Sequence, residues 1–311
     1  MPEAISFDAT RAWTKELPNG TVVSVREFDF KGPFAGRDPE ARMEGPQCFR
    51  VEQPPGSVVE THFHVADEYQ LVALGGGRLG RHGLRPLGVH FSSAFTPYGP
   101  IVADSAQGVI YFTLRPRRDP GALFLPAERD KLKTAPKRFF MAEPDDIALP
   151  AATLAQWDAP SLVSIHGPEQ DGAAAWRATL GPGQRLTPPK PAGDGYFIVV
   201  TGGAWLHGAD ALPLWSCAFV AQGETPPALV AGPEGLDTAI LQFPTRGAKS
   251  AAKSGAAAAD EAHECPLCGF VYAQADGLPE DGIAPGTPFA ALPAAWTCPN
   301  CDAAKADFEV V

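Results

Sequence analysis

Short apolar runs separated by glycine and proline recur along the first 245 residues of the chain. Aromatic residues stand among these runs, and the chain holds 32 Gly and 33 Pro. Because glycine and proline interrupt regular elements, this pattern predicts many short strands and turns rather than long helices. No apolar run approaches the roughly 18 residues of a membrane-spanning helix, so we expect no membrane partner.

The composition changes at residues 246–262, RGAKSAAKSGAAAADEA, which lack proline, aromatic residues and apolar periodicity. Such a segment is typical of a flexible or partly helical linker. It separates the β-type sequence from residues 263–311, which carry four of the six cysteines. The chain therefore divides into a large body and a small cysteine-containing domain.

The body contains an internal repeat. The segment PPGSVVETHFHVADEYQLVALGGG, from Pro54, matches GPGQRLTPPKPAGDGYFIVVTGGA, from Gly181. A constant offset of 127 aligns Gly56 with Gly183, Tyr69 with Tyr196 and Gly75 with Gly202. The repeat predicts two similar all-β domains in tandem.

Charge excludes some partners. The net charge of −11 argues against nucleic acid and anionic membranes, and residues 263–311 contribute −6 of it, from seven acidic residues and Lys305. The start of the chain, MPEAISFDATRAW, has no basic stretch followed by an apolar core, so no secretory signal is expected. These observations favour a cytoplasmic protein.

One motif in the first repeat carries candidate metal ligands. From Gly56 to Gly75 the spacing is G-x5-H-x-H-x3-E-x6-G, through His62, His64 and Glu68. Residues two apart in a strand face the same side, so both imidazoles are expected to point inward, with the carboxylate joining them from the next strand. Two imidazoles and one carboxylate match the facial triad of non-haem iron, and Mn, Ni, Zn or Cu suits the same ligands. The alternative is a polar-lined barrel without metal.

This spacing resembles the first conserved motif of the cupin superfamily, which implies a β-barrel around the site. The second cupin motif is incomplete. In one register, through Pro97 and Gly99, Val102 stands where a histidine belongs; in another, through Pro86 and Gly88, His90 comes one residue early. His90 is therefore a further candidate ligand or an inward neighbour of the site.

Two other residues near the motif have predicted places. Gln70 lies two positions past Glu68 on the same face, so we expect it to contact a metal ligand or the substrate. Glu68 and Gln70 are both candidates for a catalytic role. His82 lies in a predicted hairpin beside Arg81 and Arg85, and we expect it to be a solvated loop residue.

The second repeat lacks all these ligands. At the same offset, His62, His64, Glu68 and His90 fall on Pro189, Pro191, Gly195 and Cys217. Proline and glycine cannot coordinate a metal through their side chains, so the second barrel is expected to be metal-free. It would serve packing, homodimer formation or closure of the first barrel. The resemblance is thus to a bicupin with one intact site.

The remaining cysteines form two C-x-x-C pairs, Cys265 with Cys268 and Cys298 with Cys301. In a reducing compartment such pairs are more often metal ligands than disulfides. Four thiolates give a closed tetrahedral site for iron or zinc.

From His263 onward, the chain resembles a complete rubredoxin, which implies iron at these four cysteines. A zinc ribbon is the alternative, but 29 residues separate the pairs, more than ribbons usually have. The rubredoxin resemblance also assigns an aromatic core, formed by Tyr272, Phe289, Trp296 and Phe308. Two positions depart from the family: His263 replaces an aromatic residue, which is expected to loosen the core edge, and Asp302 replaces a glycine.

The predicted organisation is a metal-binding cupin barrel over 1–125, a degenerate cupin barrel over 140–245, a linker over 246–262 and a rubredoxin-like iron–sulfur domain over 263–311. The predicted function is single-electron transfer from the rubredoxin iron to a second divalent metal, Fe(II), in a cupin-type oxygenase site. Its partners would be a rubredoxin reductase or similar donor, a small-molecule substrate and O₂. Two alternatives stay open: an electron carrier whose bicupin binds a ligand or partner, and a non-redox metal-dependent cupin enzyme.

Overall fold

The computed structural model describes residues 2–30, 45–133, 138–142, 151–246, 262–265, 270–301 and 303–310. Cys268, Asp302 and most of the predicted linker lie outside these ranges. Within them nearly all regular structure is strand, which confirms the predicted mainly β fold. No helix in the described ranges is long and apolar enough to span a membrane.

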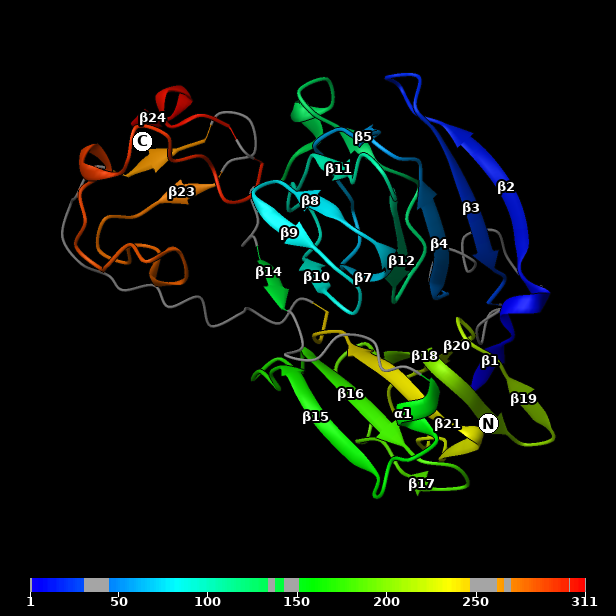
Figure 1. Cartoon of the computed structure of the whole chain (residues 1–311). Coiled ribbons are helices and arrows are strands. Elements are labelled where there is room, and N and C mark those ends of the chain that lie inside the picture. Colours follow the sequence, from blue (N-terminus) through cyan, green and yellow to red (C-terminus); the bar gives the residue numbers. More distant parts are fainter. Residues whose placement is uncertain are drawn as a thin grey trace.

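The first barrel is formed by a 7-stranded sheet in the order β14-β10-β7-β12-β4-β3-β2, a 4-stranded sheet in the order β5-β11-β8-β9, and the pair β13–β6 (Figure 1). Its strands are β2 (Arg11–Glu16), β3 (Val22–Phe28), β4 (Gln47–Gln53), β5 (Val58–Val59), β6 (His62–Phe63), β7 (Glu68–Gly75), β8 (Gly77–Leu79), β9 (His82–Leu84), β10 (Val89–Ser92), β11 (Ile101–Ala103), β12 (Val109–Arg115), β13 (Leu123–Phe124) and β14 (Phe139–Ala142). Short 3-10 turns lie at η1 (Phe7–Ala9) and η3 (Arg129–Lys131).

The second barrel is built on an 8-stranded sheet with the main order β1-β20-β18-β21-β16-β15. Its elements are β1 (Glu3–Ile5), α1 (Ala151–Leu154), β15 (Ser161–His166), β16 (Ala174–Leu180), β17 (Arg185–Leu186), β18 (Tyr196–His207), β19 (Asp210–Leu212), β20 (Cys217–Val220) and β21 (Leu229–Gln242). The cysteine domain contains β22 (His263–Glu264), β23 (Val271–Tyr272), η4 (Pro279–Asp281), η5 (Phe289–Ala291), η6 (Lys305–Asp307) and β24 (Glu309–Val310).

Two strands belong to a different barrel from the one that their position in the sequence suggests. β1 pairs with β20 in the second barrel, and β14 pairs with β10 in the first. Each strand covers an edge that would otherwise expose unpaired backbone groups. We retain 1–125 and 140–245 as proposed domain limits, with β1 and β14 crossing between them.

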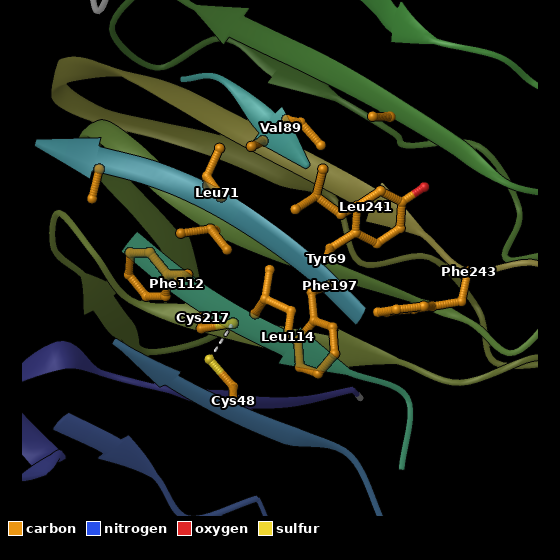
Figure 2. Packing of buried hydrophobic residues seen from close by; sticks show 14 of the residues in the cluster. Cys48, Tyr69, Leu71, Val89, Phe112, Leu114, Phe197, Cys217, Leu241 and Phe243 are labelled. Carbon is orange, nitrogen blue, oxygen red and sulfur yellow. Dashed lines mark hydrogen bonds between the residues drawn. The ribbon is translucent and has the colours of Figure 1, made fainter. Parts of the chain in front are cut away.

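The outer faces of the two barrels meet in one core (Figure 2). From the first barrel it takes buried residues that include Tyr69, Leu71 and Phe112, and from the second Phe197, Val199 and Leu241. We call this shared core the seam. The thiols of Cys48 and Cys217 meet across it, with their Sγ atoms 3.7 Å apart. The hydroxyl of Tyr69 also crosses it, donating to the carbonyl oxygen of Gln242 at 3.1 Å.

The repeat is present, but its register differs by one residue in the central strands. Leu71 pairs with Val89 in the first barrel, and Val199 pairs with Cys217 in the second, which makes the offset 128. Gly75 and Gly203 share a left-handed backbone, at φ 71° and 64°. The alignment of Glu68 with Gly195 and of His90 with Cys217 is therefore wrong, and their counterparts are Tyr196 and Ala218. Adjacent glycines in both copies hide the shift, because either offset aligns one glycine with another.

The corrected register still gives the second barrel no ligands. Its inward-facing positions are mostly apolar and include Tyr196, Ile198, Val200 and Trp205, all fully buried. These side chains pack against one another, so the interior that holds polar groups in the first barrel is filled in the second. The degenerate character of the second barrel thus follows from its packing as well as from its missing histidines.

The seam predicts that the two barrels unfold together. Phe197→Ala should lower the free energy of unfolding by about 3–5 kcal/mol, because it opens a cavity in a fully buried core. Denaturant unfolding followed by far-UV circular dichroism and by tryptophan fluorescence should give one coincident transition. Leu214→Ala, which removes a side chain that is 38% exposed, is the control and should change stability much less. Two separate transitions, of which only one responds to Phe197→Ala, would contradict the shared core.

Candidate metal centres

The predicted barrel ligands come from three neighbouring segments. His62 lies on β6, His64 follows it in the turn, Glu68 opens β7, and His90 lies on β10. Because β10 and β7 are paired antiparallel, His90 stands opposite Gln70. All five side chains are at least nine-tenths buried in the first barrel.

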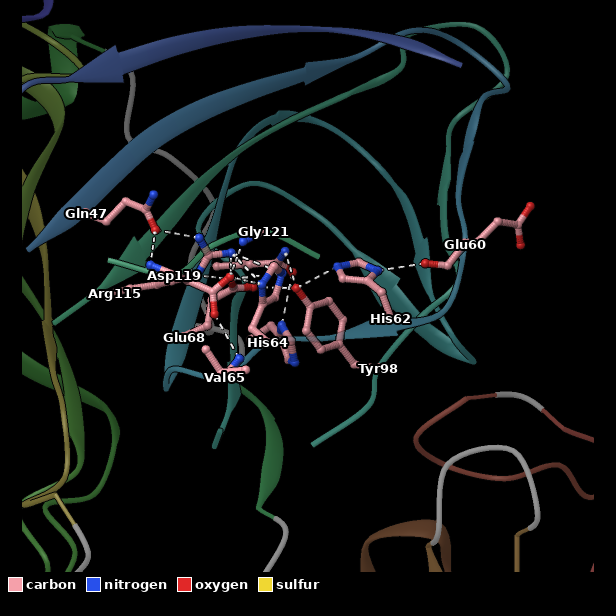
Figure 3. A network of polar contacts seen from close by, with 12 residues as sticks. Gln47, Glu60, His62, His64, Val65, Glu68, Tyr98, Arg115, Asp119 and Gly121 are labelled. Atoms are coloured by element: carbon pink, nitrogen blue, oxygen red, sulfur yellow. Dashed lines mark hydrogen bonds and ion pairs between the residues drawn. The ribbon is translucent and has the colours of Figure 1, made fainter. Parts of the chain in front are cut away.

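The two motif histidines are anchored through Nδ1 (Figure 3). Nδ1 of His62 lies 2.7 Å from the carbonyl oxygen of Glu60, and Nδ1 of His64 lies 2.8 Å from Asp119 Oδ1. Carbonyl and carboxylate oxygens only accept hydrogen bonds, so the partners assign the proton of each imidazole to Nδ1. Nε2 of each ring is then the atom left for the barrel interior, as is common in metal-bound histidines.

His90 is anchored in the same way. Its Nδ1 lies 3.0 Å from Gln70 Oε1, so it donates to the amide oxygen. Its Nε2 is buried and has no hydrogen-bond partner among the described residues. Burial lowers the pKa of His90 to about 3, and burial together with the neighbouring His64 lowers that of His62 to about 3. Both rings are therefore neutral at pH 7 and present a lone pair at Nε2.

The Tyr98 hydroxyl stands between these groups. It lies 2.5 Å from Glu68 Oε1 and 3.0 Å from His62 Nε2, while Gln70 Nε2 donates to it at 3.4 Å. Burial, with the nearby Glu68 charge, raises the pKa of Tyr98 well above its usual value, so the phenol keeps one proton. The shorter contact assigns that proton to Glu68. The lone pair on His62 Nε2 is then left, like that on His90 Nε2, without a proton donor among the described residues.

Glu68 is fully buried, and Arg115 compensates its charge. Arg115 Nε donates to Glu68 Oε2 at 2.7 Å, and Nη1 donates to Gln47 Oε1 at 2.7 Å. Burial by itself would raise the pKa of Glu68, but the Arg115 guanidinium, with His64 and the Tyr98 hydroxyl, outweighs burial and lowers it. The carboxylate is therefore ionised and accepts hydrogen bonds from two sides.

Arg115 also lies against His64. Its Nη2 is 3.0 Å from Nε2 and 3.2 Å from Nδ1 of that ring. One donor cannot lie along two in-plane nitrogen directions, so the guanidinium rests on the ring face and leaves the edge at Nε2 open. Nε2 of His64 is 3.7 Å from Glu68 Oε2.

A cavity of about 230 Å³ opens above these groups. His62, His64, Tyr98 and Arg115 line its polar floor, and its walls include apolar side chains from β2, β3, β4 and β13. Glu68 and His90 lie behind this floor. The arrangement admits a small organic molecule whose apolar part contacts the walls and whose polar group meets the imidazoles.

The cysteine domain holds a second candidate centre. Cys265, Cys298 and Cys301 are the one group of three or more His, Cys, Asp or Glu residues in the described ranges whose ligand atoms all lie within 4.8 Å of one another. Sγ of Cys265 is 3.5 Å from Sγ of Cys301, close to the roughly 3.8 Å expected between thiolates around one tetrahedral ion. The donor types and spacing fit a four-thiolate metal site, whose remaining predicted ligand, Cys268, lies outside the described residues. The ligand atoms of the barrel candidates His62, His64, Glu68 and His90 do not all lie within 4.8 Å of one another.

The aromatic residues predicted for the small core pack together. Tyr272, Phe289, Trp296 and Phe308 contact one another with ring centroids 5.2–6.1 Å apart. His263 stacks on Phe289 at 3.9 Å, with the ring planes 12° apart. The histidine therefore takes the place of an aromatic side chain, and the expected loosening of this edge is not observed.

The comparisons with known proteins decide the family of this domain. The rubredoxin family matches residues 262–308. A rubredoxin from Acinetobacter baylyi is 49% identical over 49 residues, which are 16% of this chain and 91% of that protein. The chain belongs to the rubredoxin family through this domain. The rubredoxin domain therefore implies iron and transfer of electrons to or from a partner.

The two barrels resemble solved structures in fold. A Nostoc punctiforme protein described as a "putative dioxygenase" superposes with a TM-score of 0.51 at 12% identity, covering 77% of this chain and 81% of that one. The Escherichia coli pirin YhhW, solved with nickel(II), superposes with a TM-score of 0.51 at 10% identity, covering 79% of this chain and 100% of that one. The chain thus has a bicupin-like double-barrel fold joined to a rubredoxin domain.

Three residues of the barrel site, Tyr98, Arg115 and Asp119, were not predicted from the sequence. They come from segments 30–55 residues away from the motif along the chain, so its spacing says nothing of them. Arg115 left one signal. In the alternating strand β12 it follows Tyr111 and Thr113 on the inward face, where a charge needs a buried partner. Val102, which stands where a histidine belongs in the register through Pro97 and Gly99, lies on β11 and takes no part in the contacts described for the site.

The rubredoxin domain gives a direct prediction. Cys298→Ser should abolish the red colour that thiolate-to-iron charge transfer gives the oxidised protein, because the hydroxyl is a poor substitute for a thiolate ligand. Cys48→Ser, which changes a buried thiol of the seam, should leave the visible spectrum unchanged. Absorption spectra and iron content after anaerobic reconstitution measure both. A colourless parent protein that retains tightly bound zinc after iron reconstitution would contradict the iron assignment.

Proposed function

We propose that the rubredoxin domain supplies single electrons to a metal-dependent oxygenase-type reaction in the first barrel. One observation carries the metal part of the proposal: among the described residues, Nε2 of His90 is buried without a hydrogen-bond partner, and Nε2 of His62 meets only the Tyr98 hydroxyl, whose proton goes to Glu68. A buried acceptor without a partner costs about 1–3 kcal/mol, so a fold keeps such atoms where something else binds them. Neutral imidazoles fixed through Nδ1 are suited to a divalent cation.

The metal would be held by Nε2 of His62, His64 and His90 and by the Glu68 carboxylate. Fe(II) there would supply open coordination positions for O₂ or substrate, and Mn, Ni, Zn or Cu suits the same donors. A metal on Glu68 would compete with the hydrogen bond that the Tyr98 hydroxyl donates to this carboxylate. The Tyr98 hydroxyl then holds a proton beside the site, and Gln70 keeps His90 oriented.

Arg115 supports a second candidate function. Its guanidinium already supplies one positive charge between Glu68 and the ring of His64. If that charge replaces the metal, the first barrel is a binding module for a small molecule and the rubredoxin domain serves an external partner. The two functions differ in metal content and in what re-oxidises the rubredoxin iron.

The partners follow from the chemistry. The rubredoxin iron carries one electron at a time, so an external reductase has to reload it, and the acidic rubredoxin domain suits a basic patch on such a donor. The small cavity favours a substrate of low molecular mass. A cytoplasmic location stays a prediction.

Metal counting tests the barrel site. Protein loaded anaerobically with Fe(II) should contain two irons per chain, and His64→Ala should contain one while keeping the red chromophore. His166→Ala is the matched control, because His166 stacks on Phe140 outside the barrel cavity and should leave the count at two. One iron per chain in the parent protein would reject the metal site and favour the binding module.

Coupling between the two centres is tested by re-oxidation. When anaerobically reduced protein is mixed with O₂ and substrate candidates of suitable size, return of the red band should be at least about tenfold faster with the barrel metal present than in the His64→Ala protein. The difference arises because the barrel metal would be the electron acceptor. Equal rates in stopped-flow absorption would mean that O₂ takes electrons directly from the rubredoxin iron, and the oxygenase proposal would fail.

A further inference from the structure

The rubredoxin domain lies against one hairpin of the first barrel. Strands β8 and β9 form the hairpin that the sequence predicts, and Arg81 at its tip donates from Nη2 to Asp281 Oδ2 of η4. Both side chains are mostly shielded from solvent, at 23% and 15% exposure. Beside this ion pair, a Cβ built on Gly80 would lie 3.8 Å from the carbonyl oxygen of Pro299. Figure 1 shows β8 and β9 as the part of the barrel that faces the rubredoxin domain.

Besides Asp281, the contact involves the segment of the rubredoxin domain that joins the second cysteine pair. Pro299 and Asn300, which join Cys298 to Cys301, are both buried, and Asn300 is only 7% exposed. A two-residue turn at the edge of such a small domain has little interior of its own to enter, so its burial is due largely to the hairpin. The metal-binding end of the domain, rather than its opposite end, therefore faces the barrel.

A line of aromatic rings begins behind the same hairpin. His82, which was expected to be solvated, is half-buried, and its ring lies 5.4 Å from that of Phe139 on β14. Phe139 lies 4.9 Å from His90, and His90 lies 4.6 Å from Tyr98. Tyr98 in turn contacts His62 at 4.6 Å. The rings thus connect the inner side of the hairpin to the candidate metal ligands without a gap.

We propose that the β8–β9 hairpin is the docking surface for the chain's own second cysteine pair, and that Phe139 and His90 carry the electron from there into the barrel. In the transfer, the rubredoxin iron passes from ferrous to ferric, and the oxidised metal in the barrel gains that electron. No covalent bond is made or broken, and an external reductase restores the ferrous iron by donating one electron. The route rests on the proposed function, whereas the docking contact stands without it.

Docking is tested by charge reversal in the full chain carrying zinc in the rubredoxin domain, which makes it diamagnetic for NMR. In Arg81→Glu, two acidic side chains face each other at the contact. The amide signals of the rubredoxin domain should then relax as a small, independently tumbling body, with a rotational correlation time at least about twofold shorter than in the parent. Combining Arg81→Glu with Asp281→Arg restores opposite charges and should restore the slow tumbling. Arg185→Glu, an equal charge change at an exposed position of the second barrel, is the control.

The route is tested by two neighbouring substitutions on β14. Phe139→Leu removes the ring between His82 and His90, whereas Phe140→Leu removes a ring that faces the other way, onto Phe91 and His166. In iron-loaded protein, re-oxidation of the reduced rubredoxin iron through the barrel metal should slow at least about tenfold in Phe139→Leu. Phe140→Leu should stay near the parent rate, and metal content should be two irons per chain in both.

The outcomes separate the parts of the proposal. Tumbling in Arg81→Glu that equals that of Arg185→Glu overturns the docking surface. Equal re-oxidation rates in Phe139→Leu and Phe140→Leu, with the metal count intact, overturn the route. If tumbling responds to Arg81→Glu but re-oxidation ignores the barrel metal, the docking surface stands and the proposed function falls together with the route.

Discussion

Each barrel has an apolar outer face that cannot remain in water, and the rest of the structure depends on the way these two faces cover each other. The requirement orients the central strand β7. Its alternate residues Tyr69 and Leu71 enter the seam, so Gln70 has to face the barrel interior. A slip of one residue would turn the apolar set inward and the polar set into the seam. The position of the candidate site in the first barrel is therefore a consequence of how this barrel packs against the second barrel, which has no such site.

Within the first barrel, the negative charge of Glu68 can be compensated in two ways. The buried Glu68 carboxylate needs a positive charge nearby, and both Arg115 and a divalent cation can provide it. The imidazole lone pairs separate the two cases, because a guanidinium resting on the face of His64 does not satisfy Nε2 of His62 or His90. Arg115 and a metal can therefore occupy the site together, with the arginine balancing the carboxylate and the imidazoles binding the ion. Because Arg115 balances the charge of Glu68, the ligands would together bring less negative charge to the metal than they would without this arginine.

Sequence reasoning went furthest where function depends on spacing within a short segment. The cysteine pairs, the rubredoxin aromatic core and the convergence of His62, His64 and Glu68 all follow from local patterns. It failed where contacts join distant strands, as for Tyr98 and Arg115, whose partners are set by the closure of the barrel. The repeat was found, but the adjacent glycines near Gly75 and Gly203 hid a shift of one residue in the central strands, which strand pairing and backbone conformation reveal. His82 was misjudged because its burial depends on β14, a strand that reaches back from beyond the first barrel.

The exchange of β1 also has a consequence for the time course of synthesis. Glu3 pairs with Phe219, which follows it by 216 residues. At about 5–20 residues per second, the ribosome needs roughly 10–40 s to reach Phe219 after it has made Glu3. During that interval, β1 is a strand without a sheet, which is the kind of segment that adheres to other nascent chains. Its length of only three residues and the charge of Glu3 limit that risk.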